Sequence, residues 1–204
     1  MSIEGGVLPG RRQPALIGPN AVLQAVAVME ERLGHAETLA ILADAQIADL
    51  PSGEHMIPEV DALRLHRWLA LHDPMGAFVI AEEAGARTAD YIIANRIPRP
   101  VVWLLRHLPP WLAAPMLMAA IRKHAWTFAG AGAFAADGAW RFTIDRSDSL
   151  DPVPPPESLF AWYAAVFNRL YRQLVAPDCV CHLDVTECER GLARHYTCLR
   201  KSAQ

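Results

Sequence analysis

The sequence has few lysines and no basic cluster. Only two of its 19 basic side chains are lysines, and no basic run is longer than that of Arg11-Arg12. A nucleic-acid-binding chain presents a clustered positive face, so nucleic acid is not an expected partner. With 22 acidic side chains the formal net charge is −3, and the 52% hydrophobic content is enough for a substantial core.

The sequence also lacks the apolar segment after a positive start that marks a signal peptide, so we expect a cytoplasmic protein. One apolar segment, residues 101–121, is long enough to span a bilayer. It contains Arg106, His107 and three prolines, which favour two short buried helices instead. Peripheral contact with a membrane surface stays open.

Motifs for nucleotide and acyl chemistry are missing as well. The chain has no Walker-type phosphate loop and no G-x-S-x-G elbow. Residues 130–135 match the loose dinucleotide pattern G-x-G-x-x-G/A, but a turn and a second strand are expected after them. Because a dinucleotide site needs a helix at that point, we interpret the match as chance and expect no intrinsic cofactor.

The cysteines are confined to the last 26 residues, at Cys179, Cys181, Cys188 and Cys198. In a reducing compartment they are thiols or metal ligands before they are disulfides. On a strand, Cys179 and Cys181 point away from His182 and Cys188, so the group does not converge on one ion. The pattern predicts buried thiols and no zinc site.

Turn and cap residues divide the first 124 residues into helices. The predicted helices cover 20–33 with Gly34 as the stop, 35–49, a segment from Pro58, 73–95 with Asp73-Pro74 as its start, and short segments up to His124. A further helix is predicted over 157–175, after a proline-rich linker at 151–156, with a broad apolar face.

Two hairpins are predicted around that last helix. In the first, Trp126, Phe128, Gly130, Gly132 and Phe134 share a face of one strand, and Trp140, Phe142 and Ile144 share a face of the next. A three-residue loop, 136–138, with Gly138 in the left-handed conformation would put Phe134 opposite Trp140. The second hairpin joins residues 179–188 to residues 194–200.

The glycines of the first hairpin leave space where a strand usually has bulk. In the predicted register, Gly132 lies opposite Phe142 and Gly130 opposite Ile144. Glycine in a strand often marks a place where something approaches the backbone closely. Either a core helix packs into this gap, or a flat apolar ligand lies there against Trp126, Phe128 and Phe142.

The predicted fold is α/β of the α+β type, with helices packed on an antiparallel sheet. We expect a flexible N-terminus over residues 1–15 and one domain over 16–204. Within that domain, residues 16–124 form a mainly helical part, and residues 125–200 form the part with two hairpins and a long helix.

Several stretches of the chain resemble a known family. They are IGPNAVLQ (17–24), ARTADYIIANRIP (86–98), KHAWTFAGAGAF (123–134), AVFNRLYRQLV (165–175) and VTECERGLARHYTC (185–198). Together they resemble the 4-vinyl reductase (8-vinyl in newer ring numbering) of bacteriochlorophyll biosynthesis. The resemblance extends from Leu16 to Cys198, and implies a vinyl-4-reductase domain in the C-terminal half. Such a domain is similar to haem-based nitric oxide sensors and to vesicle-tethering subunits.

The resemblance implies action on divinyl tetrapyrroles, with an 8-vinyl group reduced to ethyl. A reductase needs an electron source, and the chain shows no nicotinamide, flavin or iron-sulfur signature. Our leading hypothesis is therefore a protein that binds magnesium protoporphyrin or divinyl protochlorophyllide and passes it between pathway enzymes. The alternatives are a reductase with an external electron source and a scaffold that contacts another enzyme through residues 101–121. A homodimer is also compatible with the sequence.

A tetrapyrrole bound to this chain would use residues from the first hairpin and the helix before it. Trp126, Phe128 and Phe142 would stack on the macrocycle, with Gly130 and Gly132 leaving room for it. Arg122, Lys123 and Arg141 would lie near the propionates. His124 is either a structural histidine or the axial ligand of the magnesium. The resemblance places a Cys and a His in relatives where this chain has Phe160 and Tyr163, so their role is not transferred.

Overall fold

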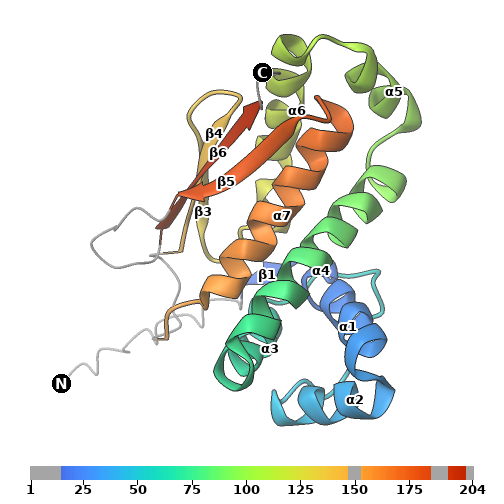
Figure 1. Cartoon of the computed structure of the whole chain (residues 1–204), viewed down its shortest axis with the longest axis vertical. Coiled ribbons are helices and arrows are strands. Elements are labelled where there is room, and N and C mark those ends of the chain that lie inside the picture. The colour runs from blue at the N-terminus through green and yellow to red at the C-terminus, as the bar shows by residue number, and fades with distance from the viewer. Residues whose placement is uncertain (1–14, 147–152, 185–192, 201–204) are drawn as a thin grey trace, which may run out of the picture.

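The computed structural model describes residues 15–146, 153–184 and 193–200 (Figure 1). Its N-terminal part is mainly helical, as predicted. The helices are α1 (Asn20–Leu33), α2 (His35–Asp44), α3 (Glu59–His72), α4 (Pro74–Asn95), α5 (Arg99–His107) and α6 (Pro110–His124). Two short strands, β1 (Leu16–Ile17) and β2 (Ile57–Pro58), pair antiparallel beside them.

Glycine, proline and aspartate set the helix boundaries. Gly34 ends α1 with a φ of 90°, which only glycine adopts without strain. Asp73 begins α4: its side chain accepts a hydrogen bond from the Gly76 N–H at 2.9 Å, and Pro74 occupies the first helical position. These two predicted boundaries are confirmed. Helix α2 ends at Asp44 and is therefore shorter than the predicted helix over 35–49.

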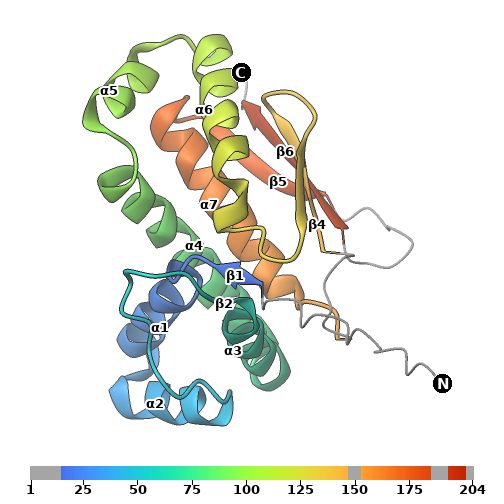
Figure 2. The same cartoon turned by 180° about the vertical axis from the view of Figure 1, so that it is seen from behind.

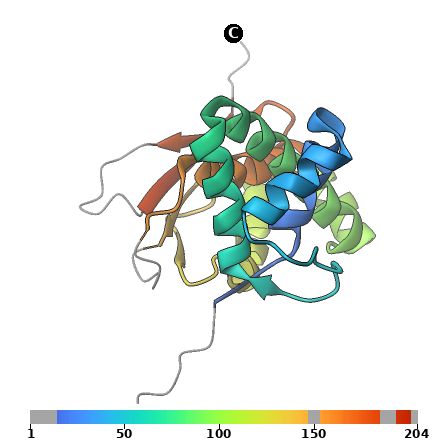
Figure 3. The ribbon, with the colours of Figure 1, turned by 90° about the horizontal axis from the view of Figure 1, so that it is seen from below.

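The C-terminal part is a four-stranded antiparallel sheet with one long helix. The strands are β3 (Ala133–Ala136), β4 (Arg141–Asp145), β5 (Cys179–Asp184) and β6 (Ala193–Arg200), in the order β3-β4-β6-β5. Helix α7 (Glu157–Leu174) packs on one face of this sheet, and the other helices lie on the same side (Figures 2 and 3). The predicted pair of hairpins flanking a long helix is confirmed.

Helices α4 and α7 join the two parts. Gly85 of α4 lies so close to α7 that an added Cβ would be 2.5 Å from the Trp162 carbonyl oxygen and 2.7 Å from the Ala165 Cβ. Any larger side chain would force the helices apart. Gly85 therefore sets the distance between α4 and α7, the helix that packs on the sheet.

The strand predicted from Trp126 is wrong. Residues Ala125–Thr127 form a short 3₁₀ helix, η1, that continues α6, and β3 begins only at Ala133. Trp126, Phe128, Gly130 and Gly132 therefore do not share a strand face. The alternation of large and small residues in this stretch belongs to a helical turn and the loop after it.

The register of the first hairpin also differs from the prediction. Phe134 pairs with Ile144, and Ala136 pairs with Phe142, so Phe134 does not lie opposite Trp140. The Asp137 N–H donates to the Arg141 carbonyl at 2.9 Å, which places the loop at residues 138–140. Gly138 has a φ of 84°, so its predicted left-handed conformation is confirmed.

The core between α7 and the sheet is largely aromatic. The predicted apolar face of α7 is confirmed, since its eight aromatic and aliphatic members are all buried: Leu159, Phe160, Tyr163, Val166, Phe167, Leu170, Tyr171 and Leu174. Phe142 and Tyr196 meet them from the sheet, with ring centroids 4.8 Å apart in a stacked pair.

The apolar segment 101–121 forms α5 and α6, as predicted, but it is only partly buried. Leu105, Leu117 and Met118 face the core, whereas Trp103 and Trp111 are 62% and 70% exposed. Among the described residues, every helix is too short or too polar to cross a membrane. The expectation of two buried helices is therefore corrected to two helices with one buried face each.

Candidate functional site

The nine residues predicted to bind a tetrapyrrole lie in three separate places. Arg122, Lys123, His124 and Trp126 are at the end of α6 and in η1. The buried Phe142 and the half-buried Phe128, Gly130 and Gly132 are in and beside the aromatic core, and Arg141 is on the outer face of the sheet. The structure does not bring all nine to one pocket. The three groups differ in burial and in the side chains that surround them.

The interior group belongs to the aromatic core. The Phe142 ring is 2% exposed and lies 4.1 Å from the Phe167 ring, centroid to centroid. The half-buried Phe128 ring meets Phe134 at 5.4 Å and Phe167 at 5.9 Å in edge-to-face contacts. These rings already have aromatic partners, so a macrocycle would have to displace α7 to stack on Phe142.

The space beside the two glycines is filled by a buried polar network. An added Cβ on Gly130 would overlap the Glu59 carboxylate, and one on Gly132 would lie 2.5 Å from the Asp145 carbonyl oxygen. The carboxylate of Glu59, the first residue of α3, occupies the space beside Gly130. Gly130 has a φ of 59°, which also favours glycine.

Arg146 is the centre of that network. Its guanidinium is fully buried, pairs with Glu59, and donates to the Tyr163 hydroxyl at 3.4 Å. Burial raises the pKa of Tyr163 to about 12, so its hydroxyl stays protonated and donates to the Phe128 carbonyl at 2.7 Å. Tyr163 therefore fixes the loop that follows η1. Tyr163 is one of the two positions, with Phe160, where the resemblance places a Cys and a His in relatives.

The surface group lies at the C-terminal end of α6. Trp126 is 66% exposed and lies in η1, just beyond the exposed Arg122 and Lys123 in the last turn of α6. His124, the last residue of α6, is also exposed. Cations in a last turn also complement the helix dipole, which is a structural reason for their position.

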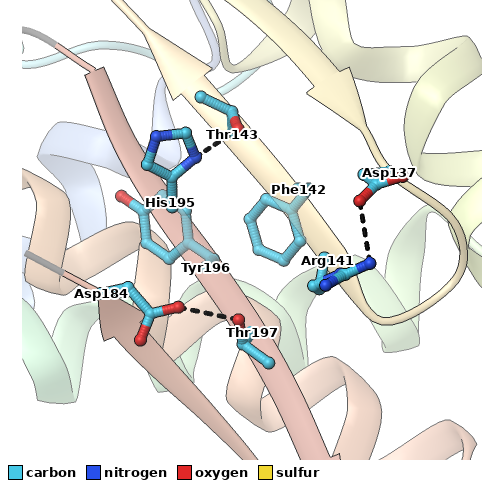
Figure 4. A pocket seen from close by; sticks show the side chains of 8 residues that line it. All are labelled: Asp137, Arg141, Phe142, Thr143, Asp184, His195, Tyr196 and Thr197. Atoms are coloured by element: carbon cyan, nitrogen blue, oxygen red, sulfur yellow. Dashed lines mark hydrogen bonds and ion pairs between the residues drawn. The ribbon is translucent and has the colours of Figure 1, made fainter. Parts of the chain in front are cut away.

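The outer face of the sheet holds a shallow polar pocket of about 340 Å³ (Figure 4). Thr143 and His195 are joined across it at 2.8 Å, and Thr197 donates to Asp184 at 2.8 Å. Arg141 pairs with Asp137 at 3.0 Å at its rim. Pockets for apolar ligands are mainly hydrophobic, so this one is suited to a small polar molecule.

A buried histidine was missed by the sequence analysis. His66 of α3 is fully buried beside Ser158, with the Nδ1 and Oγ atoms 3.4 Å apart, and burial lowers its pKa to about 4. Within the described part of the chain, its Nε2 and the Trp162 Nε1 have no hydrogen-bond partner. The helical pattern of α3 could have placed His66 on the apolar face with Leu63 and Leu69.

The C-terminal cysteines that the structure describes are thiols. Cys179 and Cys198 are buried and Cys181 is half-buried, and all three are free. Burial raises the pKa of Cys179 to about 11. No group of three or more metal-ligating side chains occurs in residues 15–146, 153–184 and 193–200. Cys188 lies outside the described residues.

The sequence is closely similar to two curated proteins. It is 40% identical over 180 residues to the bacteriochlorophyll synthase 23 kDa chain of Cereibacter sphaeroides, which covers 86% of this chain and 85% of that one. It is 38% identical over 164 residues to the protein of the same name from Rhodobacter capsulatus, which covers 79% and 76%. This chain belongs to the bacteriochlorophyll synthase 23 kDa chain family.

Membership in the bacteriochlorophyll synthase 23 kDa chain family confirms the predicted link to bacteriochlorophyll biosynthesis. No family model matches the chain. The vinyl-4-reductase domain implied by the resemblance therefore stays a prediction.

The fold of this chain resembles that of H-NOX proteins. The Fe(II) unliganded H-NOX protein from K. algicida matches with a TM-score of 0.54 at 11% identity, over 92% of this chain and 98% of that one. A mutant of it gives 0.56 at 12% identity, over 91% and 97%. A structure reported for heme redox potential and porphyrin distortion gives 0.50 at 7% identity, over 89% and 99%. The predicted fold class and its similarity to haem sensors are confirmed.

Proposed function

We propose that this chain binds a tetrapyrrole intermediate of bacteriochlorophyll biosynthesis and carries or presents it to other enzymes of the pathway. Magnesium protoporphyrin and divinyl protochlorophyllide are the ligands of choice. The family relatives are named for bacteriochlorophyll synthesis, and one structure of similar fold was reported for its porphyrin. Both support the ligand class.

The observation that carries the proposal is the surface at the end of α6. Trp126 offers an exposed indole, and the exposed cations Arg122 and Lys123 lie in the turn of α6 just before it. A flat macrocycle would stack on the indole, and its carboxylates would meet the two cations. A ligand held on a surface is released easily, which suits a carrier.

Phe128 and Phe142 have a supporting role in this proposal. Phe142 is buried in the aromatic core and the half-buried Phe128 packs against it, and the Phe128 carbonyl accepts a hydrogen bond from Tyr163. They fix the loop that follows Trp126 instead of touching the pigment. The glycines Gly130 and Gly132 let Glu59 and Arg146 reach that loop from the other side.

A pigment titration tests the proposal. Magnesium protoporphyrin is added to the purified protein, and the Soret band and tryptophan emission are followed. We expect saturable binding, and we expect Trp126→Ala to weaken it about tenfold, which corresponds to about 1.4 kcal/mol. Trp111→Ala is the matched control, since Trp111 is equally exposed at the other end of α6. Equal effects of the two variants, or no binding, would contradict the proposal.

The His124→Ala variant tests magnesium ligation separately. A lost shift of the Soret band would show that the imidazole binds the metal, whereas an unchanged spectrum would leave stacking alone. Adding NADPH to the complex of protein and divinyl protochlorophyllide tests the reductase alternative. Conversion of the vinyl group would make the chain an enzyme, and an unchanged pigment would leave it a carrier.

A further inference from the structure

Helices α5 and α6 expose an apolar surface around the turn that joins them. Its members are more than a third exposed: Val101, Trp103, Leu104, Trp111, Leu112 and Met116. Leu105 of α5, and Ala113 and Leu117 of α6, face the core instead. In Figures 1 and 2 the two helices lie at the end of the molecule away from α2 and α3. We call these six residues the α5–α6 surface.

The stretch of sequence that carries this surface has charges of one sign only. None of the 22 acidic residues of the chain falls between Asp90 and Asp137, although the net charge is −3. Arg96, Arg99 and Arg106 lie in that stretch, in or just before α5. Arg106 also donates to the Gln173 carbonyl at 3.1 Å, which holds α5 to the end of α7. An apolar surface on a stretch of chain with cations and no carboxylates complements an anionic surface.

We propose that the α5–α6 surface docks the protein on an anionic lipid bilayer. Trp103 and Trp111 stand on either side of Pro109-Pro110, and indoles favour the boundary between headgroups and acyl chains. Leucine and methionine would enter the acyl region, and the arginines would meet the lipid phosphates. Helices this short do not cross the bilayer, so the contact is peripheral.

The docking surface is separate from the proposed pigment surface. Helix α6 has 15 residues and is therefore about 22 Å long, with Trp111 near its start and Trp126 just beyond its end. The two surfaces can fail independently. Docking requires no pigment.

Vesicle flotation tests the proposal with the full chain and no pigment. We expect binding to vesicles of equal parts phosphatidylglycerol and phosphatidylcholine, weaker binding to phosphatidylcholine alone, and loss of binding at high salt. Quenching of tryptophan emission by brominated lipid gives a second readout. The double variant Trp103→Ser, Trp111→Ser should weaken binding at least about tenfold. Arg99→Glu should weaken it roughly fivefold or more.

Three controls match these variants. Trp126→Ala removes an equally exposed indole, Leu71→Ser an exposed apolar residue at the end of α3, and Arg64→Glu an arginine of α3. Each should leave flotation unchanged. No flotation with anionic vesicles, equal flotation with neutral ones, or equal losses in the controls would overturn the proposal. A protein partner for this surface would give the first of these results.

Discussion

Arg146 is the largest fully buried side chain of the described residues. Its partner Glu59 comes from a helix 87 positions away in the sequence, and also accepts a hydrogen bond from the Ala131 N–H at 3.2 Å. A buried ion pair contributes little net stability, but removing one partner leaves an uncompensated charge. The pair therefore specifies how α3 meets the sheet more than it stabilises the fold.

We expect Arg146→Met to lower the free energy of unfolding by about 3–5 kcal/mol, because Glu59 is left buried without its partner. The double variant Glu59→Gln, Arg146→Met should lose less than Arg146→Met alone. Urea denaturation measures both. Arg169→Met is the control, since its pair with Asp90 is exposed and should be worth at most about 1 kcal/mol. A double variant less stable than the single one would contradict this.

His66 makes stability depend on pH. Folded His66 stays neutral down to about pH 4, whereas the unfolded imidazole takes up a proton near its ordinary pKa of 6.5. Protons therefore favour the unfolded chain in this window. We expect the free energy of unfolding to fall by up to about 1.4 kcal/mol per pH unit between pH 6.5 and 4. His66→Leu should flatten this slope, while the exposed His55→Gln should leave it unchanged.

At the scale of elements, α7 depends on its ring contacts with the sheet. Phe167 meets Phe128, Phe134, Phe142 and Tyr196 within 6.4 Å, centroid to centroid. We expect Phe167→Ala to cost about 3–5 kcal/mol through the cavity it leaves. Leu39→Ala on the exposed face of α2 should cost less than about 0.5 kcal/mol. Thermal unfolding of the two variants compares them, and similar losses would show that this core is not close-packed.

The helices were predictable because local residues decide their ends. Asp73-Pro74 and Gly34 act within a turn of their own position, so their signals are visible in the sequence. The strand predicted from Trp126 failed for the opposite reason. What fills the space beside Gly130 is Glu59, 71 positions earlier in the chain, and no local pattern reveals it.

Local sequence also determines which residues of the candidate site lie near one another and which do not. Arg122, Lys123 and Trp126 are neighbours in the chain, so their common position at the end of α6 follows from the sequence, while their role in binding stays a prediction. Phe142 and Arg141 were assigned to the same site although successive strand residues point to opposite faces, and here the one is buried and the other exposed. Grouping them required a ligand that wraps around the strand.

At the scale of the whole molecule, pigment binding should stabilise the fold. A ligand at about 100 times its dissociation constant adds about 2.7 kcal/mol, which for a chain of this size corresponds to roughly 5–10 °C in Tm. We expect this shift with magnesium protoporphyrin, and a smaller one for Trp126→Ala at the same concentration. Differential scanning fluorimetry with a far-red dye measures it. An equal shift in both would place the pigment elsewhere.

The two proposed surfaces together define how the molecule would be oriented on a membrane. With the α5–α6 surface on a bilayer, α2 and α3 point toward the solvent, and Trp126 is held about one helix length from the lipid (Figure 1). A carrier placed in this way could receive a poorly soluble pigment near the membrane and offer it to an enzyme in solution.

Strand β5 lies at an edge of the sheet, where another chain could add a strand. The Cys181 N–H points outward from this edge, and the Asn168 side chain of α7 accepts its hydrogen bond at 3.1 Å. An incoming strand would have to break that bond before forming its own. The Asn168 hydrogen bond therefore makes the addition of a strand at this edge less favourable. Two copies that meet there gain less from extending the sheet, which protects the protein against aggregation.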